Sequence, residues 1–121
     1  VRRAAIAADS VATLIGRDLF DWGDADGPFA NAQIQHATGI AVDPATGLIY
    51  VADTYNNKIK QLDPSAGTVE TWLGDGSTSV LFEPHALSIG NGFLYIADTN
   101  NHAIRRAELD TAEAATIEPA D

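Results

Sequence analysis

The strongest constraint in this sequence is a stretch that occurs twice. Leu-Tyr-Ile-Ala-Asp-Thr-Asn-Asn-His at Leu94–His102 nearly repeats Ile-Tyr-Val-Ala-Asp-Thr-Tyr-Asn-Asn-Lys at Ile49–Lys58. In each copy an apolar run ends in Ala-Asp-Thr, an Asn-Asn pair follows, and a second run begins. Because Asn tolerates left-handed backbone angles, the pattern predicts a strand, a tight turn and a second strand. We expect turn-capping roles for Asp53 and Asp98, as acceptors of turn amide protons, and for Asn56, Asn57, Asn100 and Asn101.

The repetition extends beyond these two stretches. Asp53 and Asp98 lie 45 residues apart, a separation typical of one blade of a propeller. A Thr also follows twelve residues after each of three matching apolar positions, which are Val1, Ile59 and Ile104. Three coincident spacings indicate three structurally equivalent units.

Each complete unit is predicted to hold four strands. The inner strands are Thr38–Asp43 and His85–Ile89, the second strands Leu48–Asp53 and Phe93–Asp98, the third strands Lys58–Leu62 and Ala103–Glu108, and the outer strands Val69–Leu73 and Ala114–Ile117. The start of the chain, with strands at Arg2–Ala7 and Val11–Ile15, provides only the last two strands of an earlier unit. We therefore divide the chain into a partial blade at 1–16, a first full blade with a long lead-in loop at 17–74, and a second full blade with a tail at 75–121.

The inner strands are apolar on both faces, which is typical of sheets that are covered on both sides. Four-stranded antiparallel sheets stacked radially around an axis satisfy this requirement. The predicted fold class is therefore all-β, a segment of a β-propeller.

Composition removes several classes of function. A formal charge of −10 opposes binding to nucleic acid, and no apolar run is long enough to predict a membrane span. The absence of Cys excludes disulfides and thiolate chemistry, and it slightly favours the cytoplasm without fixing the compartment. A chain that begins at Val1 rather than Met fits a trimmed or excised piece.

The repeats resemble NHL repeats. The resemblance is carried by Thr-Gly-Ile-Ala-Val-Asp at 38–43, Ile-Tyr-Val-Ala-Asp at 49–53 and Asn-Asn-Lys-Ile-Lys at 56–60. The second copy departs at Ala86, which replaces Gly39, and in a shorter lead-in loop. Residues 19–27, Leu-Phe-Asp-Trp-Gly-Asp-Ala-Asp-Gly, are further similar to a loop of NHL proteins that carry a thioredoxin-like domain. That resemblance implies a propeller that serves as a platform for a partner, with Trp22, Asp24 and Asp26 as candidate partner contacts.

His85 is the one candidate metal ligand. It resembles the position from which NHL-type amidating lyases present a zinc-binding His. Zinc needs three or four converging ligands, and the matching position in the earlier copy is Thr38, so further ligands would lie outside this chain. A hydrogen-bonded His85 lining the channel is the favoured interpretation.

The acidic loop at residues 21–26 is a weaker candidate for a calcium site. A calcium loop would have Glu at its twelfth position, where counting from Asp24 gives Gln35 and counting from Asp21 gives Ala32. Turn formation therefore explains these carboxylates better than calcium binding.

The favoured function is a non-catalytic interaction scaffold without a cofactor. Two full units leave apolar sheet faces open, so we expect contact with a protein partner, with further blades of a longer propeller, or with other copies in a homo-oligomer. The alternative is a metal-dependent lyase or hydrolase with a channel zinc held partly by His85. RNA binding, a third class, would need a basic surface.

Overall fold

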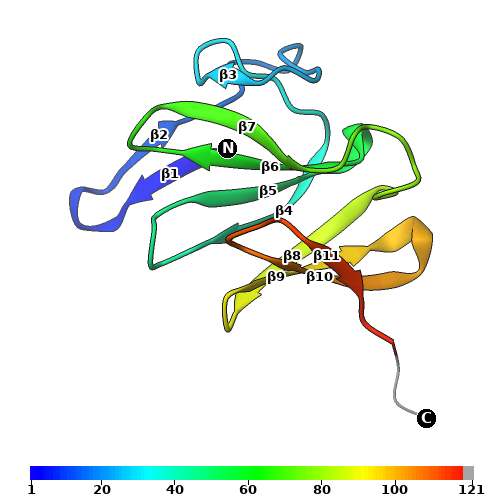
Figure 1. Cartoon of the computed structure of the whole chain (residues 1–121). Helices are drawn as coiled ribbons and strands as arrows, with labels where there is room; N and C mark the ends of the chain where they lie inside the picture. The colour runs from blue at the N-terminus through cyan, green and yellow to red at the C-terminus, as the bar shows by residue number, and fades with distance from the viewer. Residues whose placement is uncertain (119–121) are drawn as a thin grey trace.

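The computed structural model describes residues 1–118 and shows an all-β chain. Within these residues the strands form three antiparallel sheets, and the only helical segments are three short 3₁₀ turns. Figure 1 shows the sheets side by side, each turned relative to the next. The predicted fold class is confirmed.

The two larger sheets are the predicted blades. Blade 1 has the order β3-β7-β6-β5-β4, and blade 2 has the order β11-β10-β9-β8. The strands of blade 1 are β3 (Gly27–Pro28), β4 (Ala37–Val42), β5 (Ile49–Asp53), β6 (Lys58–Asp63) and β7 (Thr68–Leu73), and those of blade 2 are β8 (Pro84–Gly90), β9 (Phe93–Asp98), β10 (Ala103–Glu108) and β11 (Ala114–Thr116). The N-terminal hairpin is formed by β1 (Arg2–Ala5) and β2 (Ser10–Thr13).

The three units share one strand register. The third and fourth strands pair Arg2 with Thr13 in the hairpin, Lys60 with Thr71 in blade 1, and Arg105 with Thr116 in blade 2. The two central tyrosines also match. Tyr50 pairs with Ala41 and Gln61, and Tyr95 pairs with Ser88 and Arg106 at the corresponding positions. The register places β1 and β2 as the outer two strands of a blade that precedes blade 1.

The turns between the second and third strands are tighter than the sequence pattern suggested. Each is a single 3₁₀ turn, Thr54–Asn56 in blade 1 and Thr99–Asn101 in blade 2, and the next residue adopts left-handed angles. That residue is Asn57 in blade 1 (φ 57°) but His102 in blade 2 (φ 52°). The two Asn-Asn pairs are therefore offset by one position, and Asn56 corresponds to Asn101.

Blade 1 and blade 2 pack face to face over a shared apolar core. Tyr50, Ala52 and Ile59 of blade 1 and Leu94, Ile96 and Ala107 of blade 2 are all buried in this core. Burial of branched and aromatic side chains is the main source of stability in such an interface. The edge of Trp72 also meets the ring of Tyr50, with centroids 5.0 Å apart.

The inner strands of the two blades approach closely at Gly39. A Cβ on Gly39 would lie 2.5 Å from the His85 carbonyl oxygen, which is closer than real contacts allow. Beside it, the hydroxyls of Thr38 and Thr54 donate to the carbonyls of His85 and Pro84 at 2.9 and 2.8 Å. These two hydrogen bonds connect blade 1 to the start of the inner strand of blade 2.

The other face of blade 1 is covered only in part. Ile49, Val51, Leu62 and Val69 are buried beneath Ile15 and Ala32, with Val1, Leu14, Phe29 and Ile34 packed around them. Ile40 and Val42 on the inner strand remain 54% exposed. This is one of the apolar sheet faces that two full units are expected to leave open.

Strand β3 was not predicted. Gly27 and Pro28 pair with Val69 and Thr68 at the outer edge of blade 1, where they cover the edge of β7. Two residues carry no strand periodicity, so only the folding back of the loop creates this pairing.

Candidate functional site

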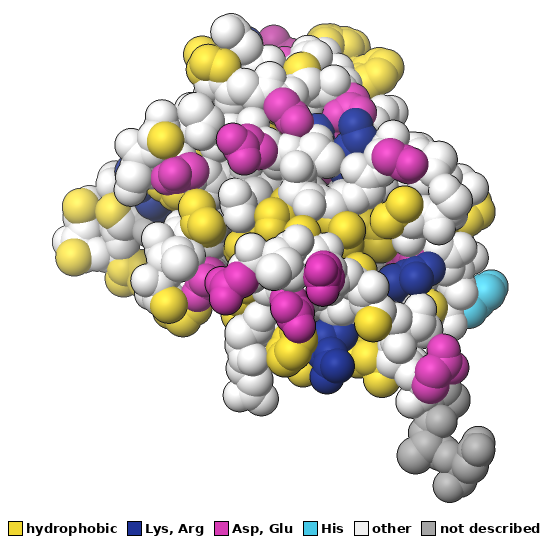
Figure 2. Space-filling view, in the orientation of Figure 1, with side chains coloured by type: hydrophobic (Ala, Val, Ile, Leu, Met, Phe, Trp, Pro, Cys, Tyr) yellow, Lys and Arg dark blue, Asp and Glu magenta, His cyan; other side chains and the backbone are white. Residues whose placement is uncertain are grey.

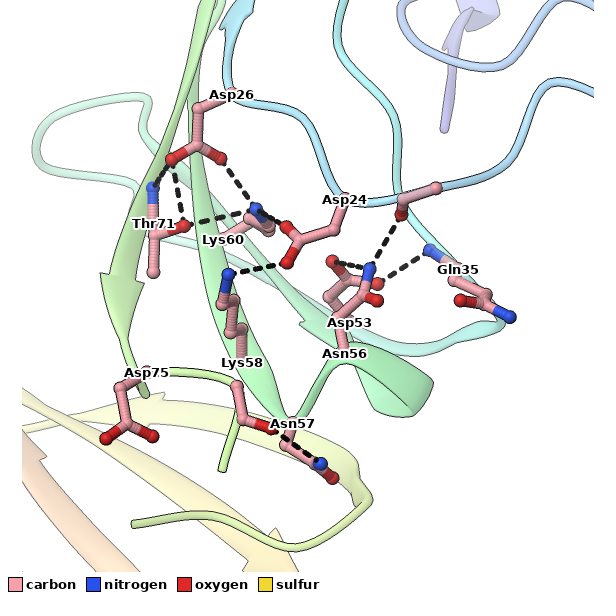
Figure 3. A network of polar contacts seen from close by, with 12 residues as sticks. Asp24, Asp26, Gln35, Asp53, Asn56, Asn57, Lys58, Lys60, Thr71 and Asp75 are labelled. Carbon is pink, nitrogen blue, oxygen red and sulfur yellow. Dashed lines mark hydrogen bonds and ion pairs between the residues drawn. The ribbon is translucent and has the colours of Figure 1, made fainter. Parts of the chain in front are cut away.

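A long loop, residues 14–36, runs from the N-terminal hairpin to β4 and crosses one end of blade 1 (Figure 1). Within it, Asp24 and Asp26 meet two lysines of β6, Lys58 and Lys60 (Figure 3). We call these four residues and Thr71 the carboxylate–lysine cluster. It holds three of the five ion pairs found among residues 1–118.

Lys60 is the centre of the carboxylate–lysine cluster. Its side chain is only 1% exposed, and its Nζ donates to Asp24 Oδ1 at 2.7 Å, to Asp26 Oδ1 at 2.6 Å and to Thr71 Oγ1 at 3.1 Å. Lys58 Nζ donates to the second oxygen of Asp24 at 2.6 Å. The backbone amide and the hydroxyl of Thr71 donate to the second oxygen of Asp26. All four carboxylate oxygens thus have a partner within the protein.

The ion pairs shift the ionisation of the cluster. Burial alone would raise the pKa of Asp24 and Asp26, but hydrogen bonds from Lys60, with those from Lys58 and Thr71, hold both below the ordinary value. Burial alone would lower the pKa of Lys60, and its hydrogen bonds to the two carboxylates raise it instead. The cluster therefore stays fully charged at neutral pH, which suits a structural latch and not proton transfer.

Asp53 lies next to the cluster and is completely buried. Its Oδ1 accepts from the backbone amide of Gln35 at 2.7 Å, and its Oδ2 accepts from Asn56 Nδ2 at 2.9 Å. Asn56 Nδ2 also donates to the Gly23 carbonyl. Burial raises the pKa of Asp53, and these hydrogen bonds oppose the rise. Asp53 thus fastens the long loop to the turn, whereas the sequence predicted acceptance of the turn's own amides.

Asp98 makes the same arrangement in blade 2. It accepts from the Phe82 amide at 2.7 Å, from Asn101 Nδ2 at 2.8 Å and from Arg105 Nε at 2.7 Å. Here too the backbone amide that donates to the carboxylate belongs to the loop that enters the blade, and not to the turn. Asp53 and Asp98 are therefore anchors between a loop and a turn.

Asn57 and Asn100 contact the loop that leads into blade 2. Asn57 Oδ1 accepts from the Glu83 amide at 2.8 Å, and its Nδ2 donates to the Gly76 carbonyl at 3.2 Å. Asn100 Nδ2 donates to the Glu83 carboxylate at 2.8 Å. Both residues tie neighbouring loops together at one end of the sheets.

Sequence reasoning missed the role of Lys60, although a signal was present. The third strand carries a basic residue at one matching position in every unit: Arg2, Lys60 and Arg105. Arg105 also donates to Thr116 Oγ1 at 3.1 Å, as Lys60 does to Thr71. Asp24 and Asp26 form ion pairs with lysines because the loop folds back over β6, and their contact with a partner stays a prediction.

The structure places His85 at the junction between the blades. Its Nδ1 lies 2.8 Å from the Glu83 carbonyl oxygen. Among residues 1–118, no three His, Asp or Glu side chains are grouped so that they could hold a metal ion. Nothing in the described structure supports the alternative of a zinc-dependent enzyme.

The long loop also presents large apolar side chains to solvent. Leu19 is 86% exposed, Phe20 82% and Trp22 58%. Figure 2 shows apolar side chains at the upper end of the molecule, where Figure 1 places this loop. Leu19 and Phe20 are exposed on this loop as Trp22 is, although sequence reasoning did not predict a role for them.

Two sheets that share four equivalent strands, with β3 added at the edge of blade 1, pack face to face and have their loops joined at one end. This arrangement defines the protein class as a β-propeller segment. Within residues 1–118 the structure contains no helix that is long and apolar enough to span a membrane.

Comparison with known proteins agrees with this class. Residues 34–62 match the family model of the NHL repeat. The chain is 42% identical to human NHL repeat-containing protein 2 over 92% of its own length and 18% of the relative's. It is 40% identical to Protein SUPPRESSOR OF QUENCHING 1, chloroplastic, of Arabidopsis thaliana over 83% of its own length and 10% of the relative's. The chain thus spans less than a fifth of the length of these curated relatives.

Solved structures support the fold alone. A protein of unknown function from Bacteroides thetaiotaomicron superposes with a TM-score of 0.68 at 21% identity, covering 90% of this chain and 28% of that one. An auxiliary nutrient binding protein from the same organism gives 0.67 at 18% identity, covering 97% and 32%. The match at residues 34–62 and the NHL repeat-containing relatives show that the chain is an NHL-repeat protein, and the solved structures agree with a propeller fold.

Proposed function

We propose that this chain is a non-catalytic scaffold whose open sheet faces bind further propeller blades, supplied by a longer chain or by other copies. The observation that carries the proposal is the outer surface of blade 2, which we call the far face. Strand alternation and register place Ala86, Ser88, Phe93, Tyr95, Ala97, Ile104 and Arg106 on it, and Ile117 follows β11 and bonds to the Ile104 carbonyl.

The far face corresponds to a surface that is already an interface within this chain. Tyr95, Ala97 and Ile104 match Tyr50, Ala52 and Ile59 of blade 1, which are at most 1% exposed beneath blade 2. On the far face Ile104 is 49% and Ile117 43% exposed. An apolar sheet face of this kind is typical of an interaction surface.

The share of the relatives that the chain spans also supports this proposal. Human NHL repeat-containing protein 2 has more than four-fifths of its length outside the match, so sequence that could form further blades exists there.

A second candidate function is contact with a protein partner through the long loop. The carboxylate–lysine cluster holds the loop on blade 1, and Leu19, Phe20 and Trp22 lie exposed on it. A restrained loop loses less conformational entropy on binding than a free one.

Light scattering combined with size-exclusion chromatography tests the first proposal. We expect the wild-type chain to self-associate as its concentration rises, and we expect Ile104→Asp to weaken that association. The matched control is Ile6→Asp, because Ile6 is 92% exposed in the turn of the N-terminal hairpin and lies outside the far face. A wild-type chain that stays monomeric at every soluble concentration would contradict self-association, and equal effects of both variants would contradict the far face.

A further inference from the structure

We propose that the groove between β1 and β4 binds a two-stranded β-hairpin from another propeller segment, which pairs with β1 and covers Ile40 and Val42. The inference rests on the proposed scaffold function but concerns the opposite end of the chain from the far face. We call this site the hairpin groove.

The hairpin groove is formed by two adjoining hollows of about 230 and 410 Å³. Both are lined by Val1 and Ile40, so they form one continuous depression on the face of blade 1. Leu14, Val42, Ile49 and Val51 make most of its floor apolar, and Arg2 and Arg3 lie at one side.

The repeat defines what covers such a surface. Ile40 and Val42 correspond to Leu87 and Ile89 of blade 2, which are packed in the core between the blades. The strands that lie against β8 there are β4 and β5, the inner two strands of the preceding blade. By the same arrangement, the inner two strands of another blade would cover Ile40 and Val42.

The N-terminal hairpin leaves room for those two strands. In both complete blades the third strand pairs with the second strand on one side and with the fourth on the other. Strand β1 corresponds to a third strand, and within residues 1–118 it pairs only with β2. An incoming strand can therefore add to β1 by backbone hydrogen bonds, as peptides add to open sheet edges.

The junction between the blades indicates which hairpin fits. At the junction between the blades, Gly39 lies against the His85 carbonyl and the Thr38 hydroxyl donates to that same carbonyl. His85 of blade 2 corresponds to Thr38 of blade 1, so the equivalent acceptor at the hairpin groove is the Thr38 carbonyl. The Thr54 hydroxyl donates to the Pro84 carbonyl in the same way, and the equivalent acceptor at the hairpin groove is the Ala37 carbonyl. The incoming hairpin therefore needs Thr-Gly in its first strand and a Thr at the end of its second.

Charge adds a further requirement. Arg2 corresponds to Arg105, whose Nε donates to Asp98 at the end of the second strand of its own blade. An Asp at that position of the incoming hairpin would meet Arg2. The hairpin β4–β5 of this chain carries all of these features, with Thr38, Gly39, Asp53 and Thr54.

The direct test is a fusion that places a copy of residues 36–58 immediately before Val1. Lys58 precedes Ile59, and Ile59 corresponds to Val1, so the copy would continue into β1 as β5 continues into β6. We expect the fusion to raise the midpoint of thermal unfolding and to slow hydrogen exchange of the β1 amides. A fusion whose added copy carries Gly39→Ala is the matched control and should lose most of the gain.

A synthetic peptide of residues 36–58, labelled with fluorescein, tests binding between separate chains by fluorescence anisotropy. We expect saturable binding that weakens at least about tenfold with Gly39→Ala in the peptide or Ile40→Asp in the protein, a fold-change that corresponds to about 1.4 kcal/mol. Ile6→Asp in the protein should leave peptide binding unchanged, because Ile6 lies in the turn of the N-terminal hairpin and outside both the hairpin groove and the far face.

The fusion decides the outcome even if the separate peptide is too unstructured to bind. No gain in midpoint and no protection of β1 would overturn the proposal, as would equal gains from the fusion and its Gly39→Ala version. A monomeric chain that still gains stability from the fusion would instead count against self-association through the far face and leave the hairpin groove supported.

Discussion

Replacing Lys60 by Met would remove the central cation of the carboxylate–lysine cluster and keep a side chain of similar length. Lys60 is 1% exposed and donates to two carboxylates and one hydroxyl. The stem of Met would retain most of the apolar burial, so the variant isolates the charge.

The magnitude follows from what the variant leaves behind. Breaking a fully buried ion pair costs about 3–5 kcal/mol, and an exposed pair contributes about 0–1 kcal/mol. Asp24 and Asp26 are 35% and 41% exposed, Asp24 keeps Lys58, and Asp26 keeps Thr71. We therefore expect Lys60→Met to lower the free energy of unfolding by about 1–2 kcal/mol, between these limits.

Urea unfolding at several pH values provides the assay. The folded pKa of Asp24 and Asp26 lies below the ordinary value, so the stability that these groups contribute is present above the unfolded pKa and is lost as pH falls through the folded pKa. The difference between wild type and Lys60→Met should therefore shrink on acidification. Lys58→Met is the control and should cost less, because Lys58 contacts only Asp24 within the cluster.

The reasoning would be refuted if Lys60→Met were as stable as wild type at neutral pH, or if the difference between them stayed constant in acid. At alkaline pH the raised pKa of Lys60 gives the opposite dependence of stability on pH. The stability from Lys60 is present below its unfolded pKa and is lost as pH rises through the folded one.

Two further substitutions probe the junction between the blades. Gly39→Ala should destabilise by about 1–3 kcal/mol, because its Cβ would meet the His85 carbonyl, although Ala is otherwise favoured over Gly in a strand; a variant with a higher melting temperature would contradict the close approach. Thr54→Val should cost about 1–3 kcal/mol in urea unfolding, because the buried Pro84 carbonyl loses the hydroxyl that donates to it. Thr99→Val is its control and should be nearly neutral, since Thr99 is exposed and its hydroxyl donates only to the Ala97 carbonyl; equal costs at both positions would count against a special role for the junction.

Much of the fold could be predicted from the sequence because the repeat compares one part of the chain with another. The matched spacings to Thr13, Thr71 and Thr116 gave the register of three strand pairs, and the pairs occur as expected. Strand alternation fixes which residues share a face. Gly39 is part of the NHL-like pattern, but only the structure shows that it lies against the His85 carbonyl.

The candidate site was harder to predict, since it depends on where a loop of irregular structure folds. Asp24 and Asp26 are more than thirty residues from Lys58 and Lys60 in sequence, and no periodicity links them. The same holds for Asp53, whose partner Gln35 lies in the loop before β4. A matching basic position at Arg2, Lys60 and Arg105 was visible, yet a lysine on a strand is usually at the surface.

The central claim is that two equivalent sheets stack with β4 lying directly on β8. Nuclear Overhauser effects in solution test this most directly at Gly39, since a Cβ built there would lie 3.0 Å from the Cα of Ala86. We predict strong cross-peaks between the α protons of Gly39 and the α proton of Ala86. Their absence, in a folded sample that shows the pairs of Tyr50 with Ala41 and of Tyr95 with Ser88, would contradict the stacking.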